Sequence, residues 1–383
     1  MGPLAGVKVI EMKGIGPGPY AGMLLADMGA EVIVVERSAT PTSIAPPSSM
    51  DINSRGKQSI VLDLKSPQGL QTLLKLVATA DVFFEGYRPG VAERIGFGPD
   101  ICLQHNPKLV YGRMTGWGQT GPLATVAGHD INYISLTGSL AAIGGSDKPV
   151  PPLNLVGDYA GGSLFLVMGI LAALFEAQKS GQGQVIDAAI VDGSASLMTL
   201  FHTLGKLGLW SNRRQANMLD GAAHFYDSYE TADGKFISIG SIEPQFYALL
   251  LEKAQLDPEV FKDQHDPAQW PQLKQRLVEV FKTRTRQHWC DLMQGTDVCF
   301  APVLDYAEAP QHPHNQARDT YTEIDGVVQP APAPRFSRTA CDTPASAPAE
   351  GADTESVLLA WGFSEQETAE LVAAGAVTQA SSE

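Results

Sequence analysis

The stretch GVKVIEMKGIGPGPYAGMLLADMGAEVIVVER, residues 6–37, decides the fold. Its apolar residues 6–12 predict a short buried strand, and residues 31–35 predict a second one. Between them lie a glycine loop at residues 14–19 and an apolar segment at residues 20–28 that is typical of a helix. A strand, a helix and a second strand in this order form a βαβ unit, which indicates a parallel sheet.

The glycine loop invites comparison with a dinucleotide-binding fingerprint, in which an acidic residue about 20 residues further on binds the ribose. Glu36 has that position. However, Gly16 is followed by Pro17, Gly18 and Pro19, so the third glycine is missing and two prolines remove backbone donors. The sequence favours a structural turn over nicotinamide binding.

Composition narrows the class of protein. The chain has 383 residues, of which 44% are hydrophobic and 18% charged, which is enough for two domains with ordinary cores. The net charge of -15 argues against a nucleic-acid partner, and four cysteines without a CxxC pair predict neither a metal site nor a disulfide framework. The longest apolar run, residues 164–175, is shorter than the roughly 20 residues that span a bilayer. With a strand pattern directly at the N-terminus, we expect a cytoplasmic protein without a membrane partner.

Three arginines follow predicted strands or lie close behind them. Arg37 comes directly after the second strand, Arg88 lies in the loop GYRPG after a strand at residues 81–85, and Arg94 follows shortly. Open α/β sheets bind ligands at the carboxyl ends of their strands. Arg37 alone is better explained as a solvated strand-end charge, but the three together suit a ligand with several phosphates.

The chain is expected to divide into two domains. Residues 1–200 together with 331–383 are predicted to form a large α/β domain, residues 201–224 a linker, and residues 225–330 a smaller α+β domain. The smaller domain opens with a hairpin around Asp233 and Gly234. Flexible segments are expected at residues 38–50, which are rich in Ser, Thr and Pro, and at residues 330–350, which are rich in Pro and Ala.

Three residues combine a helix start with acid/base chemistry. His129 precedes a predicted helix that opens near Asp130, Asp158 opens a long apolar helix, and Glu243 stands directly before Pro244 at another helix start. Polar side chains at these places cap backbone N–H groups, and acids there stabilise the helix dipole. Taken one at a time, these residues are better explained by structure than by catalysis.

When whole motifs are compared instead of single residues, a catalytic role becomes the better explanation. The chain resembles, almost from end to end, the α-methylacyl-CoA racemases of the family III CoA-transferase (CaiB/BaiF) superfamily. The matching segments are residues 6–37, EGYRPGV, RMTGWGQTGP, AGHDINY, PVPPLNLVGDYAGG, GQGQVIDAAIVDGS, ANMLDG, YETADGKFISIGSIEPQFYALL and PAPRFSRT. The resemblance implies a Rossmann-like large domain with a smaller α+β domain, assembled as an interlocked homodimer.

The resemblance also implies an activity in fatty acid metabolism, the interconversion of (2R)- and (2S)-2-methylacyl-CoA thioesters through an enolate. AGHDINY puts His129, and LVGDYAGG puts Asp158, in the positions of the two acid/base groups. IEPQFY puts Glu243 where a carboxylate of the other subunit holds that histidine. Inverting the carbon requires removal of its proton on one face and return of a proton on the other. The backbone N–H of Asp130 would stabilise the enolate oxygen, and no metal or separate cofactor is implied.

Contacts with the CoA part of the substrate are implied in the same way. Arg37, Arg88 and Arg94 match positions near the phosphates and adenosine, which agrees with the three-arginine argument. The matching contact segments contain Leu62, Asp63, Leu64, Lys65, Gly86, Tyr87, Arg88, Pro89, Gly90, Gly128, Asp130, Ile131, Asn132 and Tyr133.

Two alternatives share most of these features. A family III CoA-transferase would use Asp158 as a nucleophile and form an acyl-enzyme anhydride. By resemblance, His129 stands where transferases carry a non-basic residue, and residues 241–247 lack the glycine-run loop of some transferases, so the racemase is favoured. A non-catalytic acyl-CoA carrier would need the arginines but not the histidine and the two carboxylates.

Overall fold

The computed structural model describes residues 2–37 and 47–380. The chain forms two compact units, one containing Met1–Thr137, Leu153–Leu197 and Asp319–Glu383, the other Gly138–Pro152 and Met198–Arg318. The loop expected at residues 38–50 falls mostly outside the described residues, and Ser48–Met50 forms a single 3-10 turn.

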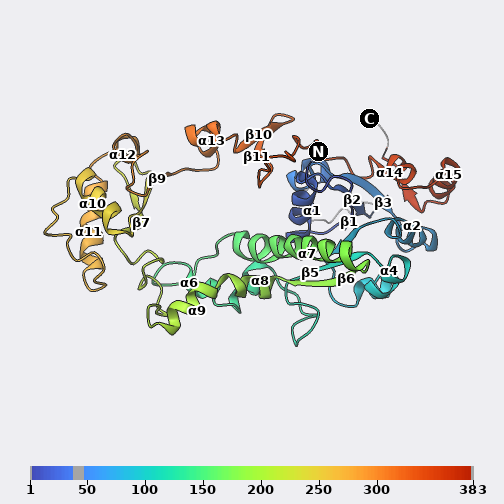
Figure 1. Ribbon diagram of the computed structural model, residues 1–383, viewed down its shortest axis with the longest axis horizontal. Helices are drawn as coiled ribbons and strands as arrows, with labels where there is room; N and C mark the ends of the chain where they lie inside the picture. The colour runs from blue at the N-terminus through green and yellow to red at the C-terminus, as the bar shows by residue number, and fades with distance from the viewer. Residues whose placement is uncertain (1, 38–46, 381–383) are drawn as a thin grey trace. The chain divides into compact units, whose positions relative to one another are not determined.

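The larger unit is built on a seven-stranded sheet in the order β12-β3-β2-β1-β4-β5-β6, of which Figure 1 labels β1, β2, β3, β5 and β6. Strands β1 to β6 are parallel, and β12 pairs antiparallel with β3 at the edge. From β3 to β6 the order is that of doubly wound nucleotide-binding folds. The predicted α/β class is therefore confirmed. The strands are β1 Lys8–Met12, β2 Glu31–Glu36, β3 Gln58–Leu62, β4 Val82–Glu85, β5 Val110–Thr115, β6 Gln184–Ala189 and β12 Val377–Thr378.

Helices cover both faces of this sheet. Because side chains alternate along a strand, Ile10 packs in the core on one face and Val9 in the core on the other. The core that contains Val9 includes residues of α1 (Pro17–Asp27) and α7 (Leu164–Ser180). The core that contains Ile10 includes residues of α2 (Pro67–Val77), α3 (Val91–Ile95), α4 (Pro99–His105) and α14 (Thr354–Ala360). Strong burial on both faces explains why β2 and β4 consist mainly of apolar residues.

The strand order reverses between β1 and β4, which lie side by side at the centre of the sheet. The connection after β1 leads towards β2 and that after β4 towards β5, so the loops at their carboxyl ends diverge and leave a crevice. The glycine loop follows β1, and the GYRPG loop follows β4. This topology places both loops at the usual ligand-binding edge.

Two buried ion pairs anchor α1 on the sheet. Lys57 Nζ lies 2.6 Å from Glu11 Oε2 and also donates to the carbonyl of Pro19. The Arg55 guanidinium donates two hydrogen bonds to Asp27 on α1. Burial lowers the pKa of Lys57 and Glu11 raises it again, whereas burial raises the pKa of Glu11. Removal of one member of such a pair leaves an uncompensated buried charge, which costs about 3–5 kcal/mol.

The apolar helix expected after residue 157 starts earlier than predicted. Leu155–Ser163 forms a π-helix, and α7 continues it, so the helical stretch Leu155–Ser180 has 26 residues. In the described part of the chain this is the one helix long and apolar enough to cross a membrane by length and composition. It packs against β5, β6 and α1, as a helix that covers a sheet does. We therefore treat it as a helix of the α/β core.

The smaller unit has its own apolar core around an antiparallel sheet in the order β7-β8-β9. The hairpin predicted around Asp233 and Gly234 is confirmed as β7 and β8. Residues 190–206 form two helices, α8 and α9, which are interrupted at Met198. The other strands and α-helices, from both units, have the following bounds: β7 Tyr226–Glu230, β8 Phe236–Gly240, β9 Phe300–Val303, β10 Tyr321–Ile324, β11 Val327–Pro330, α5 Asp130–Ser135, α6 Ser139–Ala142, α8 Ile190–Leu197, α9 Thr199–Lys206, α10 Pro244–Lys253, α11 Trp270–Phe281, α12 Arg286–Met293, α13 Pro313–Ala317 and α15 Glu365–Ala373.

The two compact units differ from the expected domains at their edges. The β10-β11 hairpin, expected in the smaller domain, belongs to the larger unit, where Arg55 donates to Gln329 and to the carbonyl of Pro330. Residues 138–152, expected in the large domain, belong to the smaller unit, where Arg214 donates to the carbonyls of Gly145 and Ala141. Long-range hydrogen bonds of this kind leave no local sequence pattern.

Candidate functional site

A cavity of about 640 Å³ lies at the carboxyl edge of the large sheet. Its lining comes from the glycine loop after β1, the loop after β4, residues 114–117 around the end of β5, the segment at residues 124–133 and the π-helix. Ten residues singled out from the sequence are among the lining residues: Arg37, Gly86, Tyr87, Arg88, Pro89, Gly128, His129, Asp130, Tyr133 and Asp158.

Other residues singled out from the sequence lie outside this lining, as far as the described residues show. Leu62 is buried at the end of β3, and the backbone N–H of Lys65 donates to Asp63 in the turn that follows. Gly90 is the left-handed residue directly before α3, and Arg94 lies in the last turn of that helix. The other residues outside the lining are Leu64, Ile131 and Asn132.

Asp158 lies on the π-helix, and its carboxylate reaches the glycine loop. The first atom of a side chain at Gly16 would lie 3.0 Å from Asp158 Oδ2, and Gly16 has φ +73°, a conformation that favours glycine. The π-helix is also tied to the glycine loop through Ser163, whose hydroxyl donates to the carbonyl of Pro17 at 2.7 Å. Isolated π-helical turns are often found at functional sites. The glycine loop therefore supports the carboxylate.

His129 lies directly before α5 with an extended backbone, φ -132° and ψ 173°. Its backbone N–H donates to Asn132 Oδ1 at 3.0 Å, and its carbonyl accepts from the backbone N–H of Asn132 at 2.8 Å. These two bonds fix the backbone of His129. The residue is exposed and is one of the residues that line the cavity. The predicted helix start at Asp130 is confirmed.

The pKa of Asp158 depends on its burial and on two other residues, Asp130 and His129. Burial raises the pKa of Asp158 to about 6, the Asp130 carboxylate raises it as well, and His129 lowers it. Burial is the largest of these effects, so the pKa of Asp158 lies above its ordinary value. A carboxyl group with a pKa of about 6 is accessible in both protonation states near neutral pH. Asp158 can therefore serve as an acid or as a base.

Aromatic side chains shape the cavity beside His129. Tyr133 donates a hydrogen bond from its hydroxyl to the carbonyl of Gly128, directly before the histidine. The Trp117 and Tyr133 rings pack edge to face with centroids 4.8 Å apart. A side chain at Gly116 would overlap the Tyr133 ring, so glycine is required there. Trp117 and Gly116 lie in the motif RMTGWGQTGP, but their place in the cavity was not predicted.

Cationic side chains are also among the residues that line the cavity. Arg37 and Arg88 are both there, and so is Lys13, which the sequence analysis did not single out. Lys13 Nζ donates to Ser48 Oγ at 2.7 Å and lies 3.7 Å from Glu36 Oε2. Its position directly after β1, at the carboxyl edge of the sheet, was the available signal. Three cations near one cavity suit a ligand with phosphate groups.

A buried network holds the loop that carries Arg88. Glu85, the last residue of β4, accepts from the backbone N–H of Tyr87 at 2.6 Å and from Arg113 Nε at 3.2 Å. Arg113 in turn donates to Glu93 on α3. Burial raises the pKa of Glu85 to about 7, while the Tyr87 bond and Arg113 lower it. These contacts set the path of the GYRPG loop.

Glu36 does not serve as a ribose-binding acid in this fold. It is 4% exposed and accepts hydrogen bonds from Ser48 and Ser59. These partners occupy the carboxylate within the protein. The reading of the glycine loop as a structural turn agrees with this arrangement.

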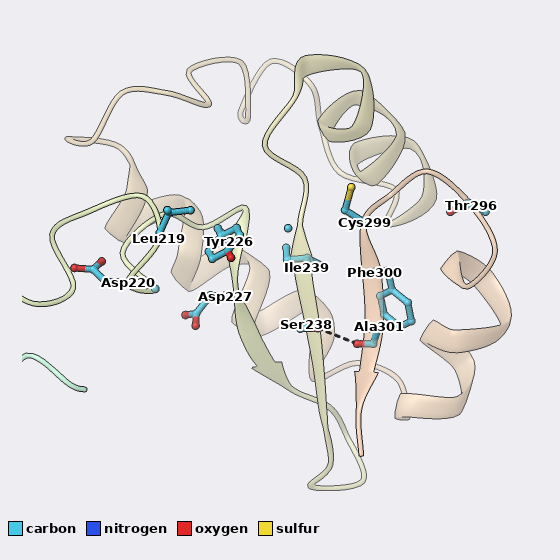
Figure 2. Close-up of a pocket in the computed structure, with 12 residues that line it drawn as sticks. Leu219, Asp220, Tyr226, Asp227, Ser238, Ile239, Thr296, Cys299, Phe300 and Ala301 are labelled. Carbon is cyan, nitrogen blue, oxygen red and sulfur yellow. Dashed lines mark hydrogen bonds between the residues drawn. The ribbon is translucent and has the colours of Figure 1, made fainter. Parts of the chain in front are cut away.

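Glu243 lies in the smaller unit, directly before Pro244 at the start of α10. Burial raises the pKa of the Cys299 thiol, and the Glu243 carboxylate raises it further, which places the two residues near each other. Cys299 lines a second cavity of about 560 Å³ between β7, β8 and β9 (Figure 2). Figure 2 also shows Tyr226 and Asp227 from β7, and Ser238 of β8 donating to the carbonyl of Ala301 at 3.3 Å.

The fold is that of a doubly wound α/β protein, and the larger cavity lies at the reversal point of its sheet, where such folds usually bind ligands. The protein belongs to CoA-transferase family III, whose family model matches residues 4–354. It is 45% identical over 371 residues to the α-methylacyl-CoA racemase of Mus musculus, with 96% of each chain covered, and 43% identical over 373 residues to that of Homo sapiens, again with 96% of each covered. A crystal structure of a CaiB/BaiF family protein from Brucella suis matches with a TM-score of 0.79 and 25% identity, covering 94% of this chain and 99% of that one.

Proposed function

We propose that this protein is an α-methylacyl-CoA racemase that interconverts the (2R) and (2S) epimers of 2-methylacyl-CoA thioesters. Two relatives of that name, similar over nearly the whole chain, support the activity. The single observation that carries the mechanism is that His129 and Asp158 line one cavity and act on each other electrostatically.

In this mechanism one group removes the C2 proton and the other returns a proton to the opposite face. Asp158, with a pKa of about 6, supplies the acid in one direction and the base in the other. His129 takes the complementary role, because an imidazole ring can both accept and donate a proton. Only a proton is exchanged, and the thioester carbonyl itself makes the C2 proton acidic, so the proposal includes no metal or separate cofactor.

The intermediate is an enolate whose negative oxygen requires hydrogen-bond donors. We assign this role to the backbone N–H of Asp130 at the start of α5, beside His129. CoA phosphates would be bound by Arg37 and Arg88, with Lys13 as a further cation. Arg94 and the segment at residues 62–65 lie outside the cavity lining and would contact more distant parts of CoA.

A homodimer is part of this proposal, with Glu243 of the partner subunit holding His129. The larger unit exposes apolar side chains that suit a second copy of the chain: Leu164, Met168 and Phe175 of α7 are 48%, 58% and 61% exposed. Large contiguous apolar patches on a protein surface often mark an interface with another protein. Sedimentation of the active enzyme as a monomer would contradict the shared site.

The alternative is a CoA-transferase in which Asp158 attacks the thioester. The family to which the chain belongs is named for CoA transfer, so this reaction is the second candidate. The pKa of Asp158 does not separate the two reactions, because a carboxyl group with a pKa of about 6 can act as a nucleophile or base when ionised and as an acid when neutral. His129 has no evident task in the transferase reaction, and this favours proton transfer.

The deciding experiment incubates one epimer of a 2-methylacyl-CoA in deuterated water. The proposal predicts the appearance of the other epimer with deuterium at C2. Transfer of CoA to an added free carboxylate, without deuterium at C2, would assign the protein to the transferases instead.

A further inference from the structure

The side chain of Asp130 connects the two segments that carry the acid/base residues. Asp130 is the first residue of α5, directly after His129, and its Oδ1 accepts the backbone N–H of Asp158 at 2.6 Å. The backbone N–H of Gly157 also bonds to this carboxylate. One side chain thus holds the turn of the π-helix that bears Asp158 against the start of α5.

The contact between Asp130 and residue 157 leaves no room for a side chain at residue 157. The first atom of a side chain at Gly157 would lie 2.1 Å from Asp130 Oδ1, which is well inside a permitted contact. Gly157 is buried, so the carboxylate could not move aside without losing its bonds. The glycine and the aspartate therefore form a matched pair.

We propose that Asp130 is a positioning residue that sets the separation of His129 and Asp158 through its side chain and keeps Asp158 available in its protonated form through its charge. The inference rests on the proposed racemase reaction and deepens it. It is separate from the role of the Asp130 backbone N–H, because it concerns the carboxylate alone.

A simple backbone cap would not need the second carboxylate oxygen. Asp130 Oδ2 is buried and has no hydrogen-bond partner among the described residues. Burial raises the pKa of Asp130, while its two backbone bonds lower it. Retaining an acid in this surrounding is costly, which suggests that its charge has a function. An asparagine would cap the same two N–H groups at lower cost.

The charge of Asp130 acts on Asp158 in a small set of titratable groups. His129 and Tyr133 come from the same segment, and both interact electrostatically with Asp158. On the π-helix Tyr159 stacks on Tyr20 of α1 with ring centroids 4.2 Å apart. Arg88, from the loop after β4, acts on Tyr133. The Asp130 carboxylate raises the pKa of Asp158, so loss of its charge should lower that pKa.

Two substitutions separate charge from position. Asp130→Asn keeps an oxygen that can accept both backbone bonds but removes the charge, so the limb of the kcat/KM pH profile that belongs to the carboxyl pair should move to lower pH. Asp130→Ala also removes the bonds, so kcat should fall on the order of 10²-fold, the cost of a displacement of about 1 Å. Gly157→Ala, which displaces the same carboxylate, should reproduce the loss seen with Asp130→Ala.

The matched control is Asp100→Asn, which makes the same charge change at an exposed residue in the first turn of α4. It should leave the profile unchanged. The inference is overturned when Asp130→Asn keeps the wild-type pH profile, or when Asp130→Ala keeps wild-type kcat. Failure of the wild-type enzyme to exchange or racemise would instead refute the proposed function, so the two failures are distinguishable.

Discussion

Replacing Asp158 by asparagine should stabilise the protein at high pH although it removes one of the two proposed acid/base groups. The folded structure raises the pKa of this carboxyl from 3.8 to about 6. The sign follows directly: above pH 6 the group is ionised in both states and its charge is unfavourable in the fold, whereas below 3.8 it is neutral in both and the penalty vanishes. The wild-type protein therefore loses stability from this group as the pH rises through that interval.

The size of the penalty follows from the same two values. Each pKa unit corresponds to about 1.4 kcal/mol, so the full effect is at most about 3 kcal/mol at pH 8 and roughly half of that at pH 5. Asparagine has nearly the same shape and no charge, so Asp158→Asn should recover a large part of this free energy of unfolding.

The assay compares thermal or denaturant unfolding of the variant and the wild type at pH 8 and pH 5, at equal protein concentration. Asp100→Asn on the exposed start of α4 serves as the control for the change in net charge. A variant that is less stable than the wild type at pH 8, or equally stabilised at both pH values, would refute the assignment of Asp158 as a carboxyl destabilised by burial.

Three further substitutions test the parts that support the site. Gly16→Ala should lower kcat on the order of 10²-fold, because the new methyl group would lie 3.0 Å from Asp158 Oδ2. Its control is Gly6→Ala, which is also at positive φ but has no atom within 4 Å of the new methyl group. Equal activity of the two variants would contradict the account. Lys57→Met should lower the free energy of unfolding by about 3–5 kcal/mol and the added change Glu11→Leu should restore much of it, whereas Lys75→Met, in an exposed pair with Glu367, should change little. Arg88→Gln should raise KM on the order of 10-fold at low salt with kcat unchanged; an unaltered KM across salt concentrations would remove Arg88 from CoA binding.

Much of the fold follows from local sequence patterns. The buried strands β1 and β2, the start of α5 at Asp130 and the hairpin β7-β8 were predicted from apolar runs, a helix-start pattern and the Asp233-Gly234 turn. Each of these signals operates within a few residues, so the sequence carries it directly.

The parts that the sequence did not predict depend on long-range packing. The π-helix was missed because its hydrogen bonds do not follow the spacing of an α-helix, and its extra turn is fixed by contacts with α8 and α1. The hairpin β10-β11 was placed in the wrong unit because Arg55, far away in the sequence, anchors it. Local periodicity contains neither kind of information.

The candidate site also has features that the sequence predicted and features that only the structure shows. His129, Asp158 and Arg88 were found through motifs, and the structure places them around one cavity. The bond from Asp158 to the Asp130 carboxylate joins residues 28 positions apart, and the pKa of Asp158 depends on how completely the fold buries it. Such properties require the assembled structure.

The most direct test of opposed acid/base groups is deuterium exchange at C2 of each epimer by variants that retain only one of them. We expect Asp158→Asn to exchange the C2 proton of one epimer without inversion, and His129→Ala to exchange that of the other epimer only. Exchange of both epimers by either variant would show that a single base reaches both faces, and it would contradict the two-sided site described above.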